Sequence, residues 1–179
     1  DKIYCVSEPV RKQVIARFPE LADRTEVLLN FIDIKQVQRR SEEPLSDPQY
    51  TGELKFLTVG RASEEKGYDI AVQITAELKK RGLCFKWFII GDGRDLNKLR
   101  TMAKEYQVEQ EIIFLGMREN PAPYVKSCDL YLQPSRHEGY PITIVEARSL
   151  QKVIIASDIP SMREQIRDGE NGYLCPLDV

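Results

Sequence analysis

The sequence predicts a doubly wound α/β fold built on a parallel sheet. Short apolar runs alternate with segments in which apolar residues recur every three or four positions, as strands alternate with crossover helices in such folds. Several apolar runs are followed directly by glycine or a short polar loop, and 179 residues suffice to bury one substantial core. The loops after parallel strands collect along one sheet edge, where these folds bind ligands.

The chain opens with a strand and a helix. Ile3–Val6 is an apolar run that predicts a strand, Ser7 is a suitable helix cap, and Val10–Phe18 predicts a short helix. A second strand is expected at Glu26–Leu29. We expect Ser41–Gly52 to be a loop, because it holds two prolines and several charged residues.

The remainder repeats a strand followed by a helix, and glycines end several of the predicted elements. The predicted strands are Leu54–Val59, Cys84–Ile90, Ile112–Leu115, Asp129–Leu132, Val153–Ala156 and Gly172–Cys175. The predicted helices cover residues 70–82, 96–106, 121–127 and 161–167, and one more begins at Pro141.

Composition limits the classes of protein that fit. A hydrophobic content of 42% and a charged content of 30% are typical of a globular protein. The formal net charge of −2 gives no electrostatic case for a nucleic-acid partner. No apolar run approaches the roughly 18 residues that cross a bilayer. Four scattered cysteines and a single histidine argue against a zinc site and favour free thiols in a reducing compartment.

The most informative stretch runs from residue 133 to residue 146. It holds a polar loop, a proline and two glutamates eight positions apart, Glu138 and Glu146. Pro141 suits the first position of a helix, since its missing N–H would be unpaired there anyway. The N–H groups of residues 142–144 would then be free, and such a helix end attracts phosphate. Carboxylates beside it could bind hydroxyls, so the stretch suggests a nucleotide or nucleotide-sugar.

Two further loops could complete this site. Arg61 and Lys66 lie between a predicted strand and a predicted helix, near where a diphosphate would sit, although a solvated basic pair is the simpler alternative. Gly91-Asp92-Gly93 is a tight turn without the G-x-G-x-x-G pattern of dinucleotide sites, and it could be a turn alone.

The roles of other polar and aromatic residues stay open at this point. Glu138 and Glu146 could be a catalytic carboxylate pair, or one helix-cap charge and one surface group. His137, the single histidine, fits a hydrogen-bonding residue or a bystander better than an acid–base group. Trp87 lies in an apolar strand and is expected in the core rather than under a base.

Taken in order, these motifs resemble the nucleotide-sugar-binding half of a GT-B glycosyltransferase of the retaining family four, glycosyl transferases group 1. Gly60-Arg61 with Lys66-Gly67 is similar to the family's G-R-x-x-x-x-K-G loop, and Gly91-Asp92-Gly93 to its G-x-G turn. Glu138 and Glu146 match its E-x(7)-E pair. The segments at 155–158 and 168–172 resemble its downstream strand and turn.

The resemblance implies a Rossmann-like fold and a role for each motif. Arg61 and Lys66 would neutralise the diphosphate, Glu146 would accept ribose hydroxyls, and Glu138, the catalytic candidate, would bind sugar hydroxyls near the reacting carbon. The N–H groups after Pro141 would hold the distal phosphate, and the backbone near position 117 would meet the base. The other donor-binding residues that it implies are Gly60, Gly91, Asp92, Met117, Arg118, Gly139, Ile142, Thr143 and Ile144. Neither a metal nor a cofactor is expected, and no D-x-D motif is present.

The sequence departs from the family pattern at two places. Tyr140-Pro141 stands where members often have a second glycine after the aromatic, and Gln151 stands where they often have glycine. Both changes bear on loop shape and therefore on donor choice, and neither removes a charged group.

By the same resemblance, residues 1–24 look like the last strand–helix unit of an acceptor domain. Residues 25–179 would form the donor domain, truncated before its C-terminal helices. Leu29–Asp33 resembles the N-G-x-D hinge, with Phe31 in place of glycine. We therefore expect a fragment of a longer protein that binds donor but transfers little or no sugar.

The implied reaction is transfer of a sugar, with retention, from a UDP- or GDP-sugar to a saccharide or lipid-linked acceptor in polysaccharide or glycolipid biosynthesis. Such donors imply a cytoplasmic site, with peripheral contact at the inner membrane face as one option for the full-length protein. A GT-B sugar-nucleotide epimerase and a non-enzymatic nucleotide-sensing module are the alternatives.

Overall fold

The computed structural model describes residues 1–52 and 54–177. The strands are β1 (Ile3–Cys5), β2 (Thr25–Val27), β3 (Lys55–Val59), β4 (Lys86–Ile90), β5 (Ile112–Gly116), β6 (Leu130–Gln133), β7 (Val153–Ser157) and β8 (Tyr173–Cys175). The α-helices are α1 (Glu8–Arg17), α2 (Ile34–Ser41), α3 (Tyr68–Lys80), α4 (Leu96–Glu105), α5 (Ala122–Ser127), α6 (Ile142–Ser149) and α7 (Pro160–Arg163). Two 3₁₀ turns, η1 (Pro19–Arg24) and η2 (Glu64–Lys66), complete the described elements.

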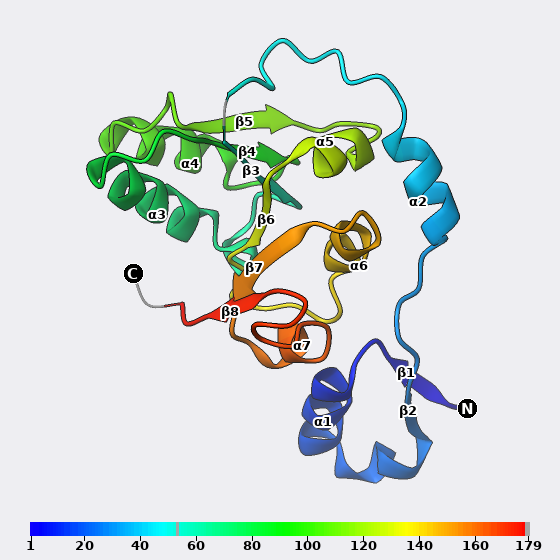
Figure 1. The fold of residues 1–179 in the computed structure, drawn as a ribbon. Coiled ribbons are helices and arrows are strands. Elements are labelled where there is room, and N and C mark those ends of the chain that lie inside the picture. The colour runs from blue at the N-terminus through cyan, green and yellow to red at the C-terminus, as the bar shows by residue number, and fades with distance from the viewer. Residues whose placement is uncertain (53, 178–179) are drawn as a thin grey trace.

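A six-stranded parallel sheet forms the centre of the molecule (Figure 1). Its strand order is β5-β4-β3-β6-β7-β8, and each described pair is parallel. The predicted doubly wound fold is therefore confirmed. The chain winds in one direction from β3 to β5 and in the other from β6 to β8, so the order reverses between β3 and β6. Ligands bind such sheets outside the carboxyl ends of the strands at this reversal point.

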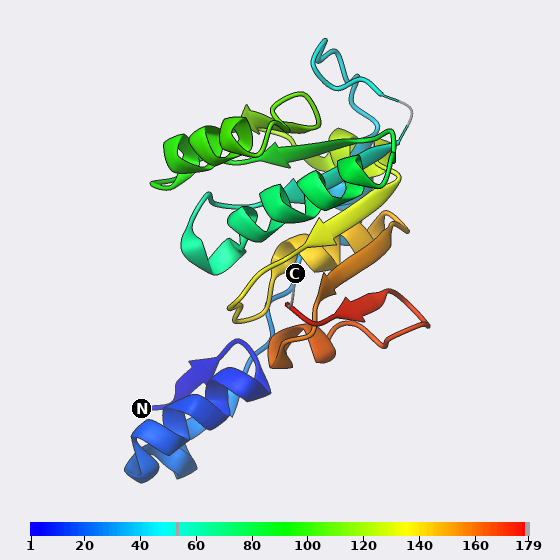
Figure 2. The ribbon, with the colours of Figure 1, turned by 90° about the vertical axis from the view of Figure 1, so that its left-hand side faces the viewer.

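Apolar side chains alternate along the strands and supply a core on each face of the sheet. On one face, shown with α3 and α4 in front of it in Figure 2, Phe56 and Trp87 pack with residues of these helices. On the other face, the neighbouring residues Leu57 and Phe88 pack with residues of α5 and α6. Trp87 is a core residue, as its strand position predicts, and its indole N–H donates to Thr58 Oγ1 at 2.9 Å.

The N-terminal residues form a separate small unit, seen at the lower right of Figure 1. β1 and β2 pair as a parallel two-stranded sheet, and α1 and η1 connect them. The second strand is Thr25–Val27 rather than the expected 26–29, and it belongs to this unit. The sheet of the N-terminal unit thus includes residues 25–27, which the resemblance assigns to the donor domain.

Among the described residues, the sequence analysis missed the α-helix α2 and the short 3₁₀ turns η1 and η2. α2 lies between the N-terminal unit and the long loop, and Ser41, expected to begin that loop, is its last residue. Asp33 caps α2 by accepting a hydrogen bond from the Gln36 N–H at 3.0 Å. The helix then contacts α6 through Gln38 Nε2, which donates to the Ser149 carbonyl at 3.3 Å.

The other differences lie at element ends. β4 begins two residues later than predicted, at Lys86, and β6 extends one residue further, to Gln133. α7 is shorter than the predicted 161–167 helix and ends at Arg163. Its single turn is followed by hydrogen bonds between the Asn171 side chain and residues 165 and 167, which hold the chain as a loop.

Candidate functional site

The predicted loops after β3 and β4 lie directly against each other. The Ala62 N–H donates to the Asp92 carbonyl at 3.0 Å, and the Gly60 N–H donates to the Ile90 carbonyl at 2.9 Å. A Cβ placed on Gly91 would lie 1.9 Å from the Gly60 carbonyl oxygen. Glycine at position 91 therefore permits the close backbone approach at the carboxyl end of the sheet.

The loop after β3 also contacts the loop after β6, across the reversal point of the sheet. Gly67 has φ of 65°, and a Cβ there would lie 2.0 Å from the Pro134 carbonyl oxygen. The Arg136 N–H donates to the Glu65 carbonyl at 2.8 Å. The Arg136 guanidinium binds both carboxylate oxygens of Asp69, at 2.7 and 2.6 Å. Such a bidentate pair orients both partners, so it holds the loop after β6 against the start of α3.

This contact brings together Lys66 and Glu138, two of the predicted site residues. Lys66 Nζ lies 2.6 Å from Glu138 Oε1, and the two side chains are 21% and 9% exposed. The residues are separated by 72 positions in the chain. The structure therefore pairs the cation predicted for the diphosphate with the carboxylate predicted for the donor sugar.

Glu138 has two further hydrogen-bond donors that the sequence analysis did not identify. Ser135 Oγ donates to Oε1 at 2.7 Å, and Gln133 Nε2 donates to the same oxygen at 3.0 Å. The Tyr131 hydroxyl in turn donates to Gln133 Oε1 at 3.3 Å. The sequence does carry a signal for these two donors, because polar residues occupy alternate positions, Gln133 and Ser135, at the end of a buried strand.

The helix end after Pro141 differs in detail from the prediction. Pro141 is the residue before α6, which begins at Ile142, and no side chain caps this end. The Ile144 N–H, which was expected to be free, donates to the Pro141 carbonyl at 3.2 Å. A tight first turn satisfies that donor within the helix. Ile144 is buried, so only the N–H groups of Ile142 and Thr143 remain as candidates for an anion.

Glu146 lies in the second turn of α6 and is half-buried. Burial raises the pKa of its carboxyl above the ordinary range, and the nearby Arg40 opposes that shift. The charge of Glu146 also contributes to the raised pKa of the buried Tyr131, after burial itself. Tyr131 also supports Glu138 through Gln133.

The other predicted residues occupy the rim of the site or support its loops. Arg61 is exposed after β3, and Met117 is exposed after β5. Asp92 Oδ1 accepts the Gly93 N–H at 2.7 Å, so this carboxylate helps to form its own turn. Gly139 faces the N-terminal unit, since a Cβ there would lie 3.0 Å from a Val6 methyl carbon.

Arg118 uses its side chain to hold the long loop in place. Its guanidinium binds Asp47 Oδ2 at 2.8 Å and donates to the Tyr124 hydroxyl at 3.0 Å. Only its backbone remains available for the contact with a base that the resemblance implies. His137 is exposed beside Glu138, and its backbone N–H donates to the Glu65 carbonyl at 3.3 Å.

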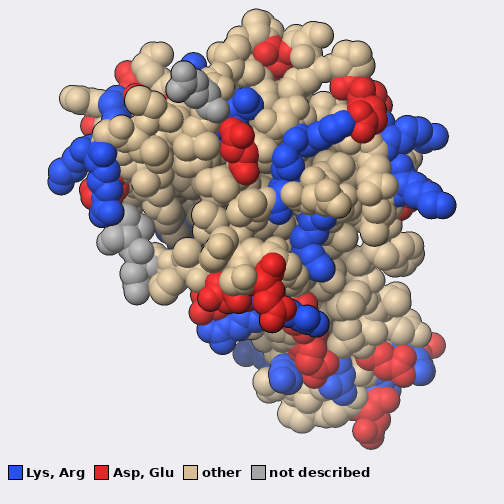
Figure 3. Space-filling model, in the orientation of Figure 1, with Lys and Arg blue, Asp and Glu red and all other residues tan. Residues whose placement is uncertain are grey.

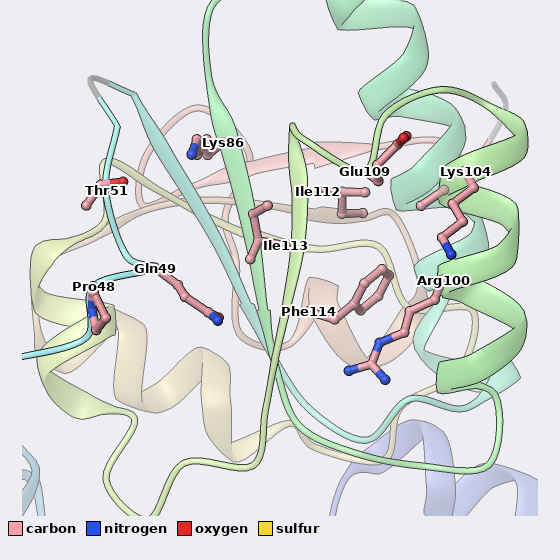
Figure 4. Close-up of a pocket in the computed structure, with 11 residues that line it drawn as sticks. Pro48, Gln49, Thr51, Lys86, Arg100, Lys104, Glu109, Ile112, Ile113 and Phe114 are labelled. Atoms are coloured by element: carbon pink, nitrogen blue, oxygen red, sulfur yellow. The ribbon is translucent and has the colours of Figure 1, made fainter.

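A separate hollow lies away from these residues, along β5 and α4 (Figure 4). Its lining includes Lys86 and Ile112, which begin their strands, and Arg100 and Lys104 of α4. It therefore opens at the sheet edge and toward the amino ends of the strands. Because doubly wound sheets bind ligands at the carboxyl ends, the Lys66–Glu138 pair is the better candidate for the ligand site.

Lys and Arg are interspersed with Asp and Glu over the face shown in Figure 3. No helix in the described ranges is long and apolar enough to cross a membrane. Within the same ranges, no three His, Cys, Asp or Glu side chains gather as metal ligands would.

The strand order and the parallel pairing define a doubly wound, Rossmann-like α/β domain. The model of the family "glycosyl transferases group 1" matches residues 40–177, and the chain belongs to this family.

Two curated relatives and one solved structure illustrate the likeness. An uncharacterised glycosyltransferase of Methanocaldococcus jannaschii is 28% identical over 98% of this chain and 42% of its own length. The lipopolysaccharide 1,6-galactosyltransferase of Salmonella typhimurium is 31% identical over 94% of this chain and 46% of its own length. The chain thus spans less than half of each relative.

The structure of Anabaena HepE in complex with UDP-glucose superposes with a TM-score of 0.81 at 20% identity. That match covers 98% of this chain and 50% of HepE. At this level of identity the likeness concerns the fold, which is the predicted Rossmann-like half of a GT-B glycosyltransferase.

Proposed function

We propose that this chain is the donor-binding half of a retaining glycosyltransferase that uses a UDP- or GDP-sugar. The acceptor is a saccharide or lipid-linked saccharide in polysaccharide or glycolipid biosynthesis, and a separate domain binds it. The observation that carries the proposal is the Lys66–Glu138 pair at the reversal point of the sheet, with Glu138 in the loop between β6 and α6. The relative that is a lipopolysaccharide 1,6-galactosyltransferase and the structural neighbour in complex with UDP-glucose support the substrate class.

The proposed roles follow from the chemistry of each group. Lys66 carries three N–H donors, so it can bind a diphosphate oxygen while it keeps Glu138 as a partner. Arg61 and the free N–H groups of α6 add positive potential on the same side, which makes a metal unnecessary. Glu138 binds donor sugar hydroxyls near the reacting carbon, and Glu146 accepts from the ribose. The reaction takes place in the cytoplasm, and peripheral contact at the inner membrane face is one option for the full-length protein.

The first test is calorimetric titration of the chain with UDP, GDP, ADP and their common sugars, for wild type and Glu146→Ala. We expect selective binding of one nucleotide with a dissociation constant of roughly micromolar to millimolar, weakened by the substitution. The absence of binding to both this chain and the full-length protein would refute the proposal. Transfer by the 179-residue chain alone would refute the separate acceptor domain.

A second test addresses the diphosphate. Lys66→Ala should weaken the nucleoside diphosphate by about tenfold or more and leave the nucleoside nearly unchanged, because a charge-assisted hydrogen bond contributes about 1.5–3 kcal/mol. Arg81→Ala, which removes an exposed cation at the end of α3, is the matched control. Equal weakening of nucleoside and diphosphate would exclude this role for Lys66.

A further inference from the structure

Three donors converge on one oxygen of the Glu138 carboxylate. Lys66 Nζ, Ser135 Oγ and Gln133 Nε2 lie 2.6, 2.7 and 3.0 Å from Oε1. The other oxygen, Oε2, accepts no hydrogen bond from the described residues. In the described ranges, the buried side-chain polar atoms without a hydrogen-bond partner are the Tyr68 hydroxyl and Gln165 Oε1. Oε2 of Glu138 is not one of them, so it is unpaired without being fully buried. Glu138 thus directs one oxygen at the protein and leaves the other open to a ligand.

The two neutral donors are rigidly held. Tyr131, Gln133 and Ser135 each have 0% exposure, and they alternate along β6 and its extension, so they share one face. The Ser157 hydroxyl donates to the Ser135 carbonyl and fixes the backbone of the loop. These side chains therefore have no freedom to follow a moving carboxylate.

Hydrogen-bond donation along this strand runs in a single direction. The Val59 N–H donates to the Tyr131 hydroxyl at 3.4 Å, and that hydroxyl donates to Gln133 Oε1. Gln133 Nε2 then donates to Ser135 Oγ at 2.9 Å, and Ser135 donates to Glu138. Hydrogen bonds in such a chain polarise and strengthen one another. The backbone of the central strand β3 is thereby coupled to the orientation of one carboxylate.

We propose that Gln133 and Ser135 are positioning residues that fix Glu138 with Oε2 toward the hydroxyls of the donor sugar. The proposal rests on the proposed function and adds how the sugar end of that site is organised. A free glutamate would lose side-chain freedom on binding, and fixing it beforehand removes that cost. The two residues therefore act chiefly on recognition of the sugar, and their effect on binding of the diphosphate is small.

This role predicts a selective effect that a general packing role would not give. Loss of the Ser135 hydroxyl should weaken the nucleotide-sugar by about tenfold, since a hydrogen bond to a charged group is removed. Binding of the matching nucleoside diphosphate should change by less than about twofold. A variant that merely disturbed the loop would weaken both ligands together, because the loop also contacts Lys66.

The test is calorimetric titration of the full-length protein with three pairs: UDP and UDP-glucose, GDP and GDP-mannose, and ADP and ADP-glucose. The variants are Ser135→Ala, Gln133→Met, Glu138→Ala and the double variant of Ser135 and Glu138. The measured quantity is the ratio of the two dissociation constants within the pair that wild type binds. Ser41→Ala, at a buried serine whose hydroxyl donates to Gln38 in α2, is the matched control.

We expect Ser135→Ala and Gln133→Met to shift this ratio by about tenfold toward the diphosphate, and Ser41→Ala to leave it unchanged. In the Glu138→Ala background, Ser135→Ala should have no further effect on the ratio, because Ser135 acts through Glu138. Equal weakening of both ligands by Ser135→Ala and Gln133→Met would overturn the proposal, and so would an unchanged ratio. Those outcomes leave the proposed function intact if wild type binds a pair, whereas no binding of any pair by wild type refutes both.

Discussion

Gly67 determines how closely the two main loops of the site approach each other. A Cβ at this position would lie 2.0 Å from the Pro134 carbonyl oxygen, so any side chain requires the backbone to move. The φ of 65° adds the cost of a left-handed conformation. Separation of the loops would also separate Lys66 from Glu138.

We expect Gly67→Ala to lower the free energy of unfolding by about 3 kcal/mol or more, as the sum of backbone strain and a steric clash. Gly82→Ala is the matched control, because Gly82 has φ of 79° but no atom within 4 Å of the position that a Cβ would take. It should cost only about 1–2 kcal/mol. Denaturant unfolding of both variants measures the difference, and equal losses would show that the close approach to Pro134 is not required.

The environment of Glu146 disfavours the charged form of its carboxyl. Burial raises the pKa of its carboxyl, so the folded protein holds this proton to a higher pH than the unfolded chain. Its contribution to stability is therefore full below the ordinary pKa of glutamate and is lost as pH rises through the raised value. At neutral pH the ionised, half-buried carboxylate destabilises the fold.

Glu146→Gln should thus raise the free energy of unfolding at about pH 7 and flatten its decline above about pH 4. The same variant should bind nucleotide more weakly. Denaturant unfolding between about pH 4 and pH 8 provides the measurement. Glu105→Gln, at the exposed end of α4, is the control. A loss of stability in Glu146→Gln would contradict the conclusion that the ionised Glu146 carboxylate destabilises the fold.

At the scale of elements, the long loop before β3 is held by specific contacts rather than by secondary structure. Asp47 Oδ2 accepts hydrogen bonds from Arg118 and from the Tyr124 hydroxyl, the latter at 2.9 Å. Burial opposes ionisation of Asp47, but these bonds hold the pKa of its carboxyl below the ordinary value. Tyr50 then packs against Phe88, with ring centroids 4.5 Å apart.

Asp47→Ala should therefore cost about 1–3 kcal/mol, since it leaves the Arg118 guanidinium and the Tyr124 hydroxyl without their acceptor. Thermal unfolding followed by circular dichroism measures this loss. Asp23→Ala, at an exposed position of η1, should change stability by less than about 0.5 kcal/mol. A similar midpoint temperature of thermal unfolding for the two variants would mean that the loop is not anchored through Asp47.

The sequence predicted helices and strands correctly where apolar residues recur periodically. It missed a helix whose formation depends on packing against other helices. The strands of the main sheet were found because each presents a short apolar run bounded by glycine or a polar turn. α2 was missed because only Ile34 and Val37 are apolar among its eight residues. Its cap Asp33 and the basic residues in its last turn were the available signals. The local sequence pattern favours this helix only weakly, and contacts with α5 and α6 stabilise it in the folded protein.

At the scale of the whole molecule, the fold divides the four cysteines into two classes. Cys84 and Cys175 are exposed, whereas Cys5 and Cys128 are buried. Burial raises the pKa of Cys128 to about 12, with the nearby Lys152 acting against that shift. Since the thiolate is the reactive form, a buried thiol with a raised pKa reacts slowly.

We expect two thiols of the native chain to react rapidly with a colorimetric disulfide reagent and two to react only on unfolding. In the variant with both Cys84→Ser and Cys175→Ser, the fast phase should disappear, and guanidinium should release the remaining two thiols. The absorbance of the released reagent measures both phases. A fast phase in that double variant would show that the core opens readily around Cys128 or Cys5.

The sequence by itself determined the parallel α/β architecture and the loops that carry the site. These depend on local patterns: apolar periodicity, glycines after strands, and charged residues at fixed spacing within one loop. The tertiary structure alone decided that Lys66 meets Glu138 across 72 positions, and that Gln133 and Ser135 support the same carboxylate oxygen. That outcome depends on the order of the strands, because only the placement of β6 beside β3 brings their two loops into contact.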